Sequence, residues 1–189
     1  KNANGYDLIL IGKPTDNSGF GGASFASLEL EEDEKEKNKG AVQEPNAFLE
    51  RHLLKSTYAL FKILRENNLI DKVGFKDLGA GGVACASVEL AETSGYGSEI
   101  WMEKIHIGLK NLHPSVYLCS ETQERFMWVC CPEITPTIVN HYNKVFDRDS
   151  CQCMCKDSFA ILKSDCLTKG GGRQTNFWDE NVTPVIICQ

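Results

Sequence analysis

Up to about residue 147, the apolar and polar residues are arranged in patterns typical of short strands and of longer helices. Residues 6–12 form a continuous apolar run, which predicts a strand buried on both faces. Residues 45–67 carry apolar side chains three or four positions apart, which predicts a long helix. The same patterns predict strands at 69–75, 98–105, 126–131 and 182–188, helices at 82–93 and 132–146, and a short helix or turn at 114–118.

A glycine-rich turn, Asp77-Leu78-Gly79-Ala80-Gly81-Gly82, joins the strand predicted at 69–75 to the helix at 82–93. It leaves little side-chain bulk at the helix entrance, where free N–H groups and the helix dipole present positive charge. Such a turn can bind an anion, and Asp77 at the strand end can hold a metal or a ligand hydroxyl. The alternative is a tight turn with a buried capping aspartate.

Two further polar features precede this turn. Residues 14–25 form a second glycine-rich loop, including Gly21 and Gly22, that can wrap an anion but lacks the lysine of a P-loop. Gln43 stands just before the helix at 45–67, where its amide can both donate and accept hydrogen bonds. The alternatives are a plain loop and an ordinary surface glutamine.

A third polar stretch lies at the mouth of the strand predicted at 126–131. Residues 119–125 read Cys-Ser-Glu-Thr-Gln-Glu-Arg, so small, acidic and amide side chains fill seven consecutive positions. A polar cluster beside a buried strand is a usual place for a binding site. The alternative is a strand-entry turn in which Glu124 and Arg125 pair on the surface.

Composition narrows the class of protein. The formal net charge of −6 over 189 residues argues against a nucleic-acid binder, and no apolar run reaches the length of a membrane span. Residues 31–40 form a charged insert to which we assign no chemistry. Because the chain begins with Lys1 rather than methionine, we expect it to be a segment of a longer protein. Its nine cysteines, several of them in apolar runs, indicate buried thiols in a reducing cytoplasm.

Taken together and in order, these stretches resemble one family. The chain from about residue 5 to 147 is similar to the carboxy-terminal half-domain of phosphoribosylformylglycinamidine synthase, in the aminoimidazole ribonucleotide synthetase superfamily. The resemblance rests on Gly19 to Phe25, Ala41-Val42-Gln43, Asp77 to Gly82 with Glu89-Leu90-Ala91, and Ser120 to Arg125.

The resemblance implies an ATP-dependent carbon–nitrogen ligase of purine synthesis. This family converts formylglycinamide ribonucleotide, ATP and glutamine-derived ammonia to formylglycinamidine ribonucleotide, ADP and phosphate. The family's catalytic histidines and ATP-binding lysine lie in an amino-terminal half that this chain does not contain. We therefore expect an incomplete piece that contributes substrate and magnesium contacts, has no catalytic residues of its own and is not active alone, with ATP bound mainly by the missing half.

The implied site residues follow from the motifs. Asp77 resembles a magnesium-binding aspartate, and hard oxygen ligands suit that ion. The implied substrate-binding residues are Gln43, Gly21, Gly22, Glu121, Thr122 and Gln123. Two departures stand out: residues 44–46 read Glu-Pro-Asn where the family has Gly-Asp-Pro, and Thr122 replaces a serine while keeping its hydroxyl.

The resemblance also implies the fold class and the partners. The expected fold is α/β (α+β), a layered sandwich with a mixed sheet covered by helices. Residues 1–147 would form this domain, with 148–189 a divergent tail that is partly linker or edge strand. Expected partners are the amino-terminal synthetase domain, the glutaminase and the small adaptor subunit, in the cytoplasm, without nucleic acid or membrane.

Two other functions remain open. The chain could be a non-catalytic structural or dimerisation module of the same superfamily, although such a copy need not keep Gln43, Asp77 and the triplet at 121–123. It could also bind a metal through its tail, but a C-x-C-x-C run lacks the C-x₂-C pairing usual for zinc. The cysteines in question are Cys151, Cys153 and Cys155, with Cys166 as a possible fourth ligand.

Overall fold

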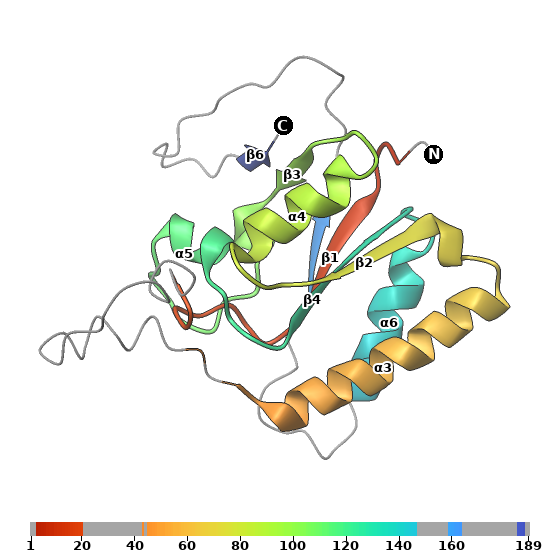
Figure 1. Ribbon diagram of the computed structural model, residues 1–189, viewed down its shortest axis with the longest axis horizontal. Helices are drawn as coiled ribbons and strands as arrows, with labels where there is room; N and C mark the ends of the chain where they lie inside the picture. Colours follow the sequence, from red (N-terminus) through yellow and green to blue (C-terminus); the bar gives the residue numbers. More distant parts are fainter. Residues whose placement is uncertain (1–2, 21–42, 44, 147–158, 164–184, 188–189) are drawn as a thin grey trace, which may run out of the picture.

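The structure is a computed structural model of the 189-residue chain. It describes residues 3–20, 43, 45–146, 159–163 and 185–187. Several features singled out in the sequence lie outside the described residues: Gly21, Gly22, the charged insert at 31–40, Cys151, Cys153, Cys155 and Cys166. The described residues build a sheet with helices on both of its faces (Figure 1).

The main sheet has four strands in the order β2-β4-β1-β5, and all of its strand pairs are antiparallel. Strand β1 (Asp7–Gly12) lies between β4 (Arg125–Cys130) and β5 (Phe159–Lys163), and β2 (Val73–Asp77) lies beyond β4. In the register of β1 and β4, Gly12 pairs with Arg125 and Asp7 with Cys130. A second pair joins β3 (Ser98–Ile100) to β6 (Val185–Ile187).

The helices divide between the two faces. Helices α3 (Ala47–Glu66) and α6 (Thr135–Phe146) pack on one face, and α4 (Gly82–Glu92) covers the other, with α5 (Pro114–Cys119) beside it (Figure 1). Two 3₁₀ turns, Ile70–Lys72 and Met102–Lys104, connect these elements. The side chain of Asn46 caps α3 by accepting a hydrogen bond from the N–H of Leu49, which explains where this helix begins.

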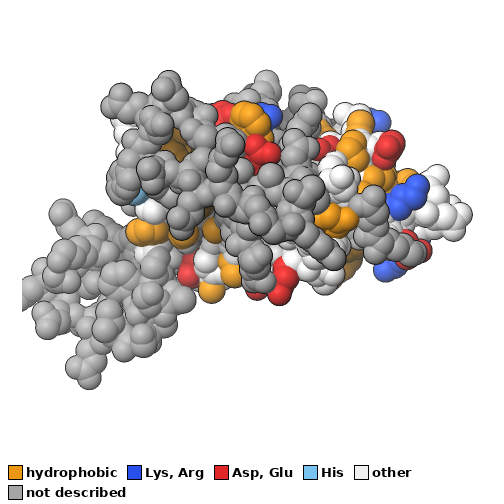
Figure 2. All heavy atoms as spheres, turned by 90° about the horizontal axis from the view of Figure 1, so that it is seen from above, with side chains coloured by type: hydrophobic (Ala, Val, Ile, Leu, Met, Phe, Trp, Pro, Cys, Tyr) orange, Lys and Arg blue, Asp and Glu red, His pale blue; other side chains and the backbone are white. Residues whose placement is uncertain are grey.

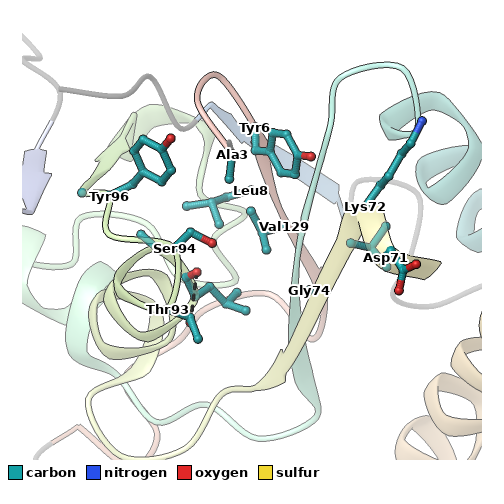
Figure 3. A pocket seen from close by; sticks show the side chains of 14 residues that line it. Ala3, Tyr6, Leu8, Asp71, Lys72, Gly74, Thr93, Ser94, Tyr96 and Val129 are labelled. Carbon is teal, nitrogen blue, oxygen red and sulfur yellow. Dashed lines mark hydrogen bonds between the residues drawn. The ribbon is translucent and has the colours of Figure 1, made fainter. Parts of the chain in front are cut away.

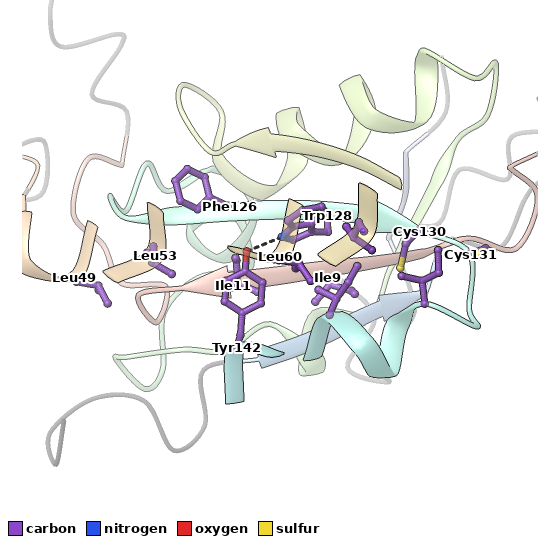
Figure 4. Packing of buried hydrophobic residues seen from close by; sticks show 13 residues of the cluster. Ile9, Ile11, Leu49, Leu53, Leu60, Phe126, Trp128, Cys130, Cys131 and Tyr142 are labelled. Atoms are coloured by element: carbon purple, nitrogen blue, oxygen red, sulfur yellow. Dashed lines mark hydrogen bonds between the residues drawn. The ribbon is translucent and has the colours of Figure 1, made fainter. Parts of the chain in front are cut away.

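Strand β1 separates two hydrophobic cores because successive side chains point to opposite faces of a sheet. Ile9 and Ile11 face α3 and α6, where Trp128 and Tyr142 are also fully buried (Figure 4). Leu8 and Leu10 join the core under α4. This arrangement confirms that the apolar run at 6–12 is a strand buried on both faces.

The expected layered α/β fold class is confirmed, but the described sheets are antiparallel throughout, so the expectation of a mixed sheet is wrong. The elements themselves differ from the prediction in three places. The strand predicted at 69–75 begins only at Val73, because Asn68 takes a positive φ of 56° and the chain then makes a 3₁₀ turn. The strand predicted at 98–105 ends at Ile100, which pairs with Val185, the first residue of its antiparallel partner β6. The sequence pattern predicts no strand at 159–163, yet β5 pairs along β1.

The surface seen in Figure 2 mixes side chains of every kind. Acidic and basic groups lie among hydrophobic ones on its described part, so the charge there is not gathered into one patch. Among the described residues, no helix is long and apolar enough to cross a membrane.

Candidate functional site

Side chains nearly 80 residues apart in the sequence meet at the loop that enters β4. The Nε2 group of Gln123 donates to Oε1 of Gln43 at 2.5 Å, and Nε2 of Gln43 lies 3.5 Å from Oε2 of Glu121. Glu121 is 8% exposed, whereas Gln43 is exposed and Gln123 is half-buried. Together they form a hydrogen-bonded series of two amides and one carboxylate that runs from the surface inward.

The lack of a side chain at Gly19 leaves room for the side chains of Gln43 and Glu121. A Cβ atom at this position would lie 3.0 Å from Cβ of Glu121 and 3.1 Å from Cγ of Gln43. Gly19 also has a φ of +66°, a conformation that side chains rarely adopt. The glycine-rich loop predicted at 14–25 therefore contacts the predicted site residues directly, at Gly19.

Thr122 joins the site to the loop after β1. Its hydroxyl donates to Oδ1 of Asp16 at 2.9 Å, and the N–H of Asp16 donates to Thr122 Oγ1 at 3.1 Å. The hydroxyl of Ser120 lies 2.9 Å from the same Oγ1 and donates to the carbonyl of Ser18. Thr122 is fully buried, so we assign it to holding the two loops together.

The carboxylate of Asp16 is the acceptor at the centre of these loops. Burial opposes its ionisation, but hydrogen bonds from the N–H and hydroxyl of Ser18 and from Thr122, together with Lys13 Nζ at 3.3 Å, outweigh burial. The pKa of Asp16 is therefore lowered from its ordinary value of 3.8.

The lowered pKa predicts how Asp16→Asn changes the pH dependence of stability. A depressed carboxyl pKa contributes stability above the unfolded-state pKa, and this contribution is lost as the pH falls through the folded-state pKa. At about pH 6 we expect the variant to lose about 1–2 kcal/mol of unfolding free energy, and near pH 3 the gap to the parent chain should shrink. Urea unfolding at both pH values measures this, and an unchanged gap would contradict it.

The glycine turn places Asp77 on the surface. Helix α4 begins at Gly82 after Gly81, an N-cap in the left-handed conformation that makes no side-chain capping bond. Asp77 is exposed, so the alternative of a buried capping aspartate is wrong. Within the turn, the N–H of Gly82 donates to the carbonyl of Gly79 at 3.1 Å, so this group is not free for an anion.

A charged pair lies beside the turn. Lys76 Nζ on β2 is 2.5 Å from Oε2 of Glu89 on α4. This hydrogen bond raises the pKa of Lys76 and lowers that of Glu89. The pair ties the strand to the helix on either side of the turn that carries Asp77.

Metal binding receives limited support from these groups. Within the described ranges, no three His, Cys, Asp or Glu side chains are grouped so that they could hold a metal ion. Asp77 alone can supply one exposed carboxylate oxygen, and Mg²⁺ is often held by one or two carboxylates with ligand phosphates completing its shell. One carboxylate does not by itself make a metal site, so a magnesium contact at Asp77 stays a prediction.

A separate pocket of about 370 Å³ lies at the other end of α4. Leu8 and Val129 lie in its wall, and Tyr96 and Lys72 stand on opposite sides of it (Figure 3). None of the site residues predicted from the sequence lines this pocket. The polar cluster around Glu121, rather than this pocket, is therefore the candidate functional site.

Two charged residues of the site were not singled out from the sequence. Asp16 carried a usable signal, because an aspartate two residues before Ser18 is typical of an Asx turn. The alternative interpretation of the strand-entry turn places Arg125 on the surface, paired with Glu124. This is wrong: Arg125 is 2% exposed and donates to the carbonyls of Ser120 and Thr122. An arginine next to an apolar strand was the only local hint.

Comparison with known proteins now decides the family. The family model described as AIR synthase related protein, C-terminal domain, matches residues 4–140. The chain belongs to this family. The resemblance drawn from the motifs is thereby confirmed. A second model, described as CXCXC repeat, matches residues 143–155, which lie mostly outside the described residues.

Relatives of this AIR synthase related domain are synthase subunits. The chain is 47% identical, over 143 residues, to phosphoribosylformylglycinamidine synthase subunit PurL of Methanothrix thermoacetophila. The match covers 76% of this chain and 18% of the relative. The chain thus spans less than a fifth of that protein's length.

Solved structures agree with the fold. Thermotoga maritima PurL complexed with FGAR has a TM-score of 0.65 and 26% identity, covering 86% of this chain and 24% of that one. The same protein complexed with ATP has a TM-score of 0.58 and 20% identity, which shows the fold alone. That match covers 85% of this chain and 21% of the other.

Proposed function

We propose that this domain supplies substrate contacts to a phosphoribosylformylglycinamidine synthase. The full protein would convert formylglycinamide ribonucleotide, ATP and glutamine-derived ammonia to formylglycinamidine ribonucleotide, ADP and phosphate. The observation that carries this proposal is the hydrogen-bonded series of Gln43, Gln123 and Glu121. The motifs imply substrate binding for all three residues. The similarity to a solved PurL complexed with FGAR supports it.

The chemistry of these groups suits the amide-bearing arm of such a substrate. The side chains of Gln43 and Gln123 pair with each other through one amide N–H and one amide oxygen. A ligand amide can replace either partner without leaving the other unsatisfied, because it offers the same donor and acceptor. Glu121, behind them, adds an acceptor in a mostly buried place, where hydrogen bonds to charged groups are strong.

Phosphate and magnesium would be held at the glycine turn. We assign Asp77 to the magnesium ion and the positive end of the α4 dipole to phosphate oxygens, since a helix entrance favours anions even though the N–H of Gly82 is bonded within the turn. When bound, the ion would neutralise charge on the phosphates of ATP, which we expect to be held mainly by the rest of the synthetase. Gly21 and Gly22 are proposed to contact the substrate phosphate. The glutaminase and the small adaptor subunit are proposed partners of the whole enzyme.

Calorimetric titration of formylglycinamide ribonucleotide into the chain, with Mg²⁺ present, tests the substrate site. We expect Gln43→Ala and Glu121→Gln each to weaken binding about ten- to hundredfold, since each removes about 1–3 kcal/mol of hydrogen bonding. Asn140→Ala, an exposed change on α6, is the matched control and should leave the affinity unchanged. Asp77→Asn should remove the dependence on Mg²⁺ without preventing folding.

The same titration separates this proposal from the structural alternative. If the chain shows no binding, even after the remainder of the synthetase is supplied, then its motifs serve folding or assembly. The similarity to synthase subunits and the meeting of Gln43 with Glu121 both favour the substrate-binding role. A metal held by the cysteines of the tail would be found by elemental analysis of the purified chain.

A further inference from the structure

Arg125 is the most deeply buried charged side chain near the candidate site. It is 2% exposed, so it cannot reach a ligand directly. Its Nε donates to the carbonyl of Thr122 at 2.9 Å, and its Nη2 to the carbonyl of Ser120 at 2.6 Å. These carbonyls belong to the residues on either side of Glu121. The guanidinium therefore fixes the backbone that carries the buried carboxylate.

The same guanidinium also fixes the loop that follows β1. Its Nη1 donates to Oγ1 of Thr15 at 2.7 Å, so one rigid fork binds two loops more than 100 residues apart. Burial lowers the pKa of Arg125 to about 10, while the nearby Asp16 carboxylate opposes this and favours the charged form. Arg125 thus remains charged at neutral pH and keeps all of its donors.

Asp16 adds a second attachment between the two loops. Its N–H and carboxylate both bond to the Thr122 hydroxyl, and the hydroxyl of Ser120 reaches the carbonyl of Ser18. The segment from Ser120 to Thr122 is therefore held at both ends and through both its backbone and its side chains. A loop fixed in this way does not have to be ordered when a ligand binds, which favours affinity.

We propose that Arg125, with Asp16, is a positioning element that holds the Glu121 segment ready to bind the ligand. It acts through the carbonyls of Ser120 and Thr122, and it does not contact the ligand. The nature of that ligand rests on the proposed function, whereas the ordering of the segment does not.

Hydrogen–deuterium exchange and calorimetry on the full 189-residue chain test this proposal with Arg125→Lys. Lysine keeps the charge but cannot form the three-way fork. We expect exchange in peptides covering residues 15–19 and 118–124 to rise at least about tenfold, and the affinity for formylglycinamide ribonucleotide to fall about tenfold. Asp16→Asn should produce the same local pattern to a smaller extent.

Thr135→Val is the matched control for general loss of stability. It removes a buried hydrogen bond from Thr135 to Asp7 Oδ2 at 2.7 Å, at the opposite end of β1 from the site. We expect this variant to be destabilised without a selective rise in exchange at the two loops and without weaker ligand binding by its folded form.

The outcomes are distinct. If exchange in the two loops rises no more in Arg125→Lys than in the Thr135→Val control, or if affinity is unchanged while the loops become mobile, the positioning role is overturned. If the parent chain binds no formylglycinamide ribonucleotide even when the remainder of the synthetase is supplied, the proposed function fails. The exchange comparison then still decides whether Arg125 orders the segment.

Discussion

Gly82→Ala is expected to lower the unfolding free energy by about 2–5 kcal/mol. Gly82 has a φ of +55°, and a Cβ atom there would collide with the carbonyl oxygen of Ser120 and come within 2.9 Å of that of Leu118. Both neighbours are backbone atoms, so no side chain can move aside to relieve the overlap. Such a loss is large beside the roughly 5–15 kcal/mol that stabilises a typical domain.

Gly79→Ala, in the same turn, is the control for the Gly82 variant. A Cβ atom at Gly79 would meet nothing within 4 Å, so this change should shift stability by less than about 1 kcal/mol. Urea unfolding followed by circular dichroism measures both variants. Equal unfolding free energies for the two variants would show that the close packing of the turn against the Ser120 loop does not contribute to stability.

This comparison also bears on how the two halves of the candidate site are held together. Gly82 opens the helix that follows Asp77, and Ser120 precedes Glu121. Their contact joins the proposed magnesium residue to the proposed substrate residues. A change at Gly82 that still allowed folding would therefore be expected to weaken binding of the ligand as well.

Trp128→Ala is expected to destabilise the chain by about 3–5 kcal/mol. Trp128 is fully buried in the core between β4 and the helices α3 and α6. Its ring centroid lies 4.7 Å from that of Phe75 and 5.0 Å from that of Phe61. Its Nε1 donates to the hydroxyl of Tyr142 at 3.1 Å (Figure 4). Removal of the ring leaves a cavity and takes away this hydrogen bond.

Trp128→Phe separates the contribution of ring packing from that of the hydrogen bond to Tyr142. It keeps an aromatic ring between Phe61 and Phe75 but removes the donor to Tyr142, whose hydroxyl still has Thr57 at 2.8 Å. We expect a loss of about 1–2 kcal/mol, well below that of the alanine variant. Thermal unfolding compares them, and similar losses for both would mean that packing of the ring contributes little.

The helices and buried strands were predictable because their signals are local. The helix expected at 45–67 is observed at Ala47–Glu66, and the strand expected at 126–131 at Arg125–Cys130. Apolar periodicity identifies these segments because each must bury one face or both, whatever its partners are. The family could also be recognised, since its motifs keep their order along the chain.

The sequence by itself thus determined most of the elements and the family, and it proposed the residue types of the site, including Gln43, Glu121 and Asp77. Only the tertiary structure decided that Gln43 meets Gln123, that Asp77 is exposed, and that Arg125 is buried. Such facts depend on contacts between residues far apart in the chain, which no local pattern encodes. For the same reason β5 escaped prediction, because its place is set by pairing with β1 at the other end of the sequence.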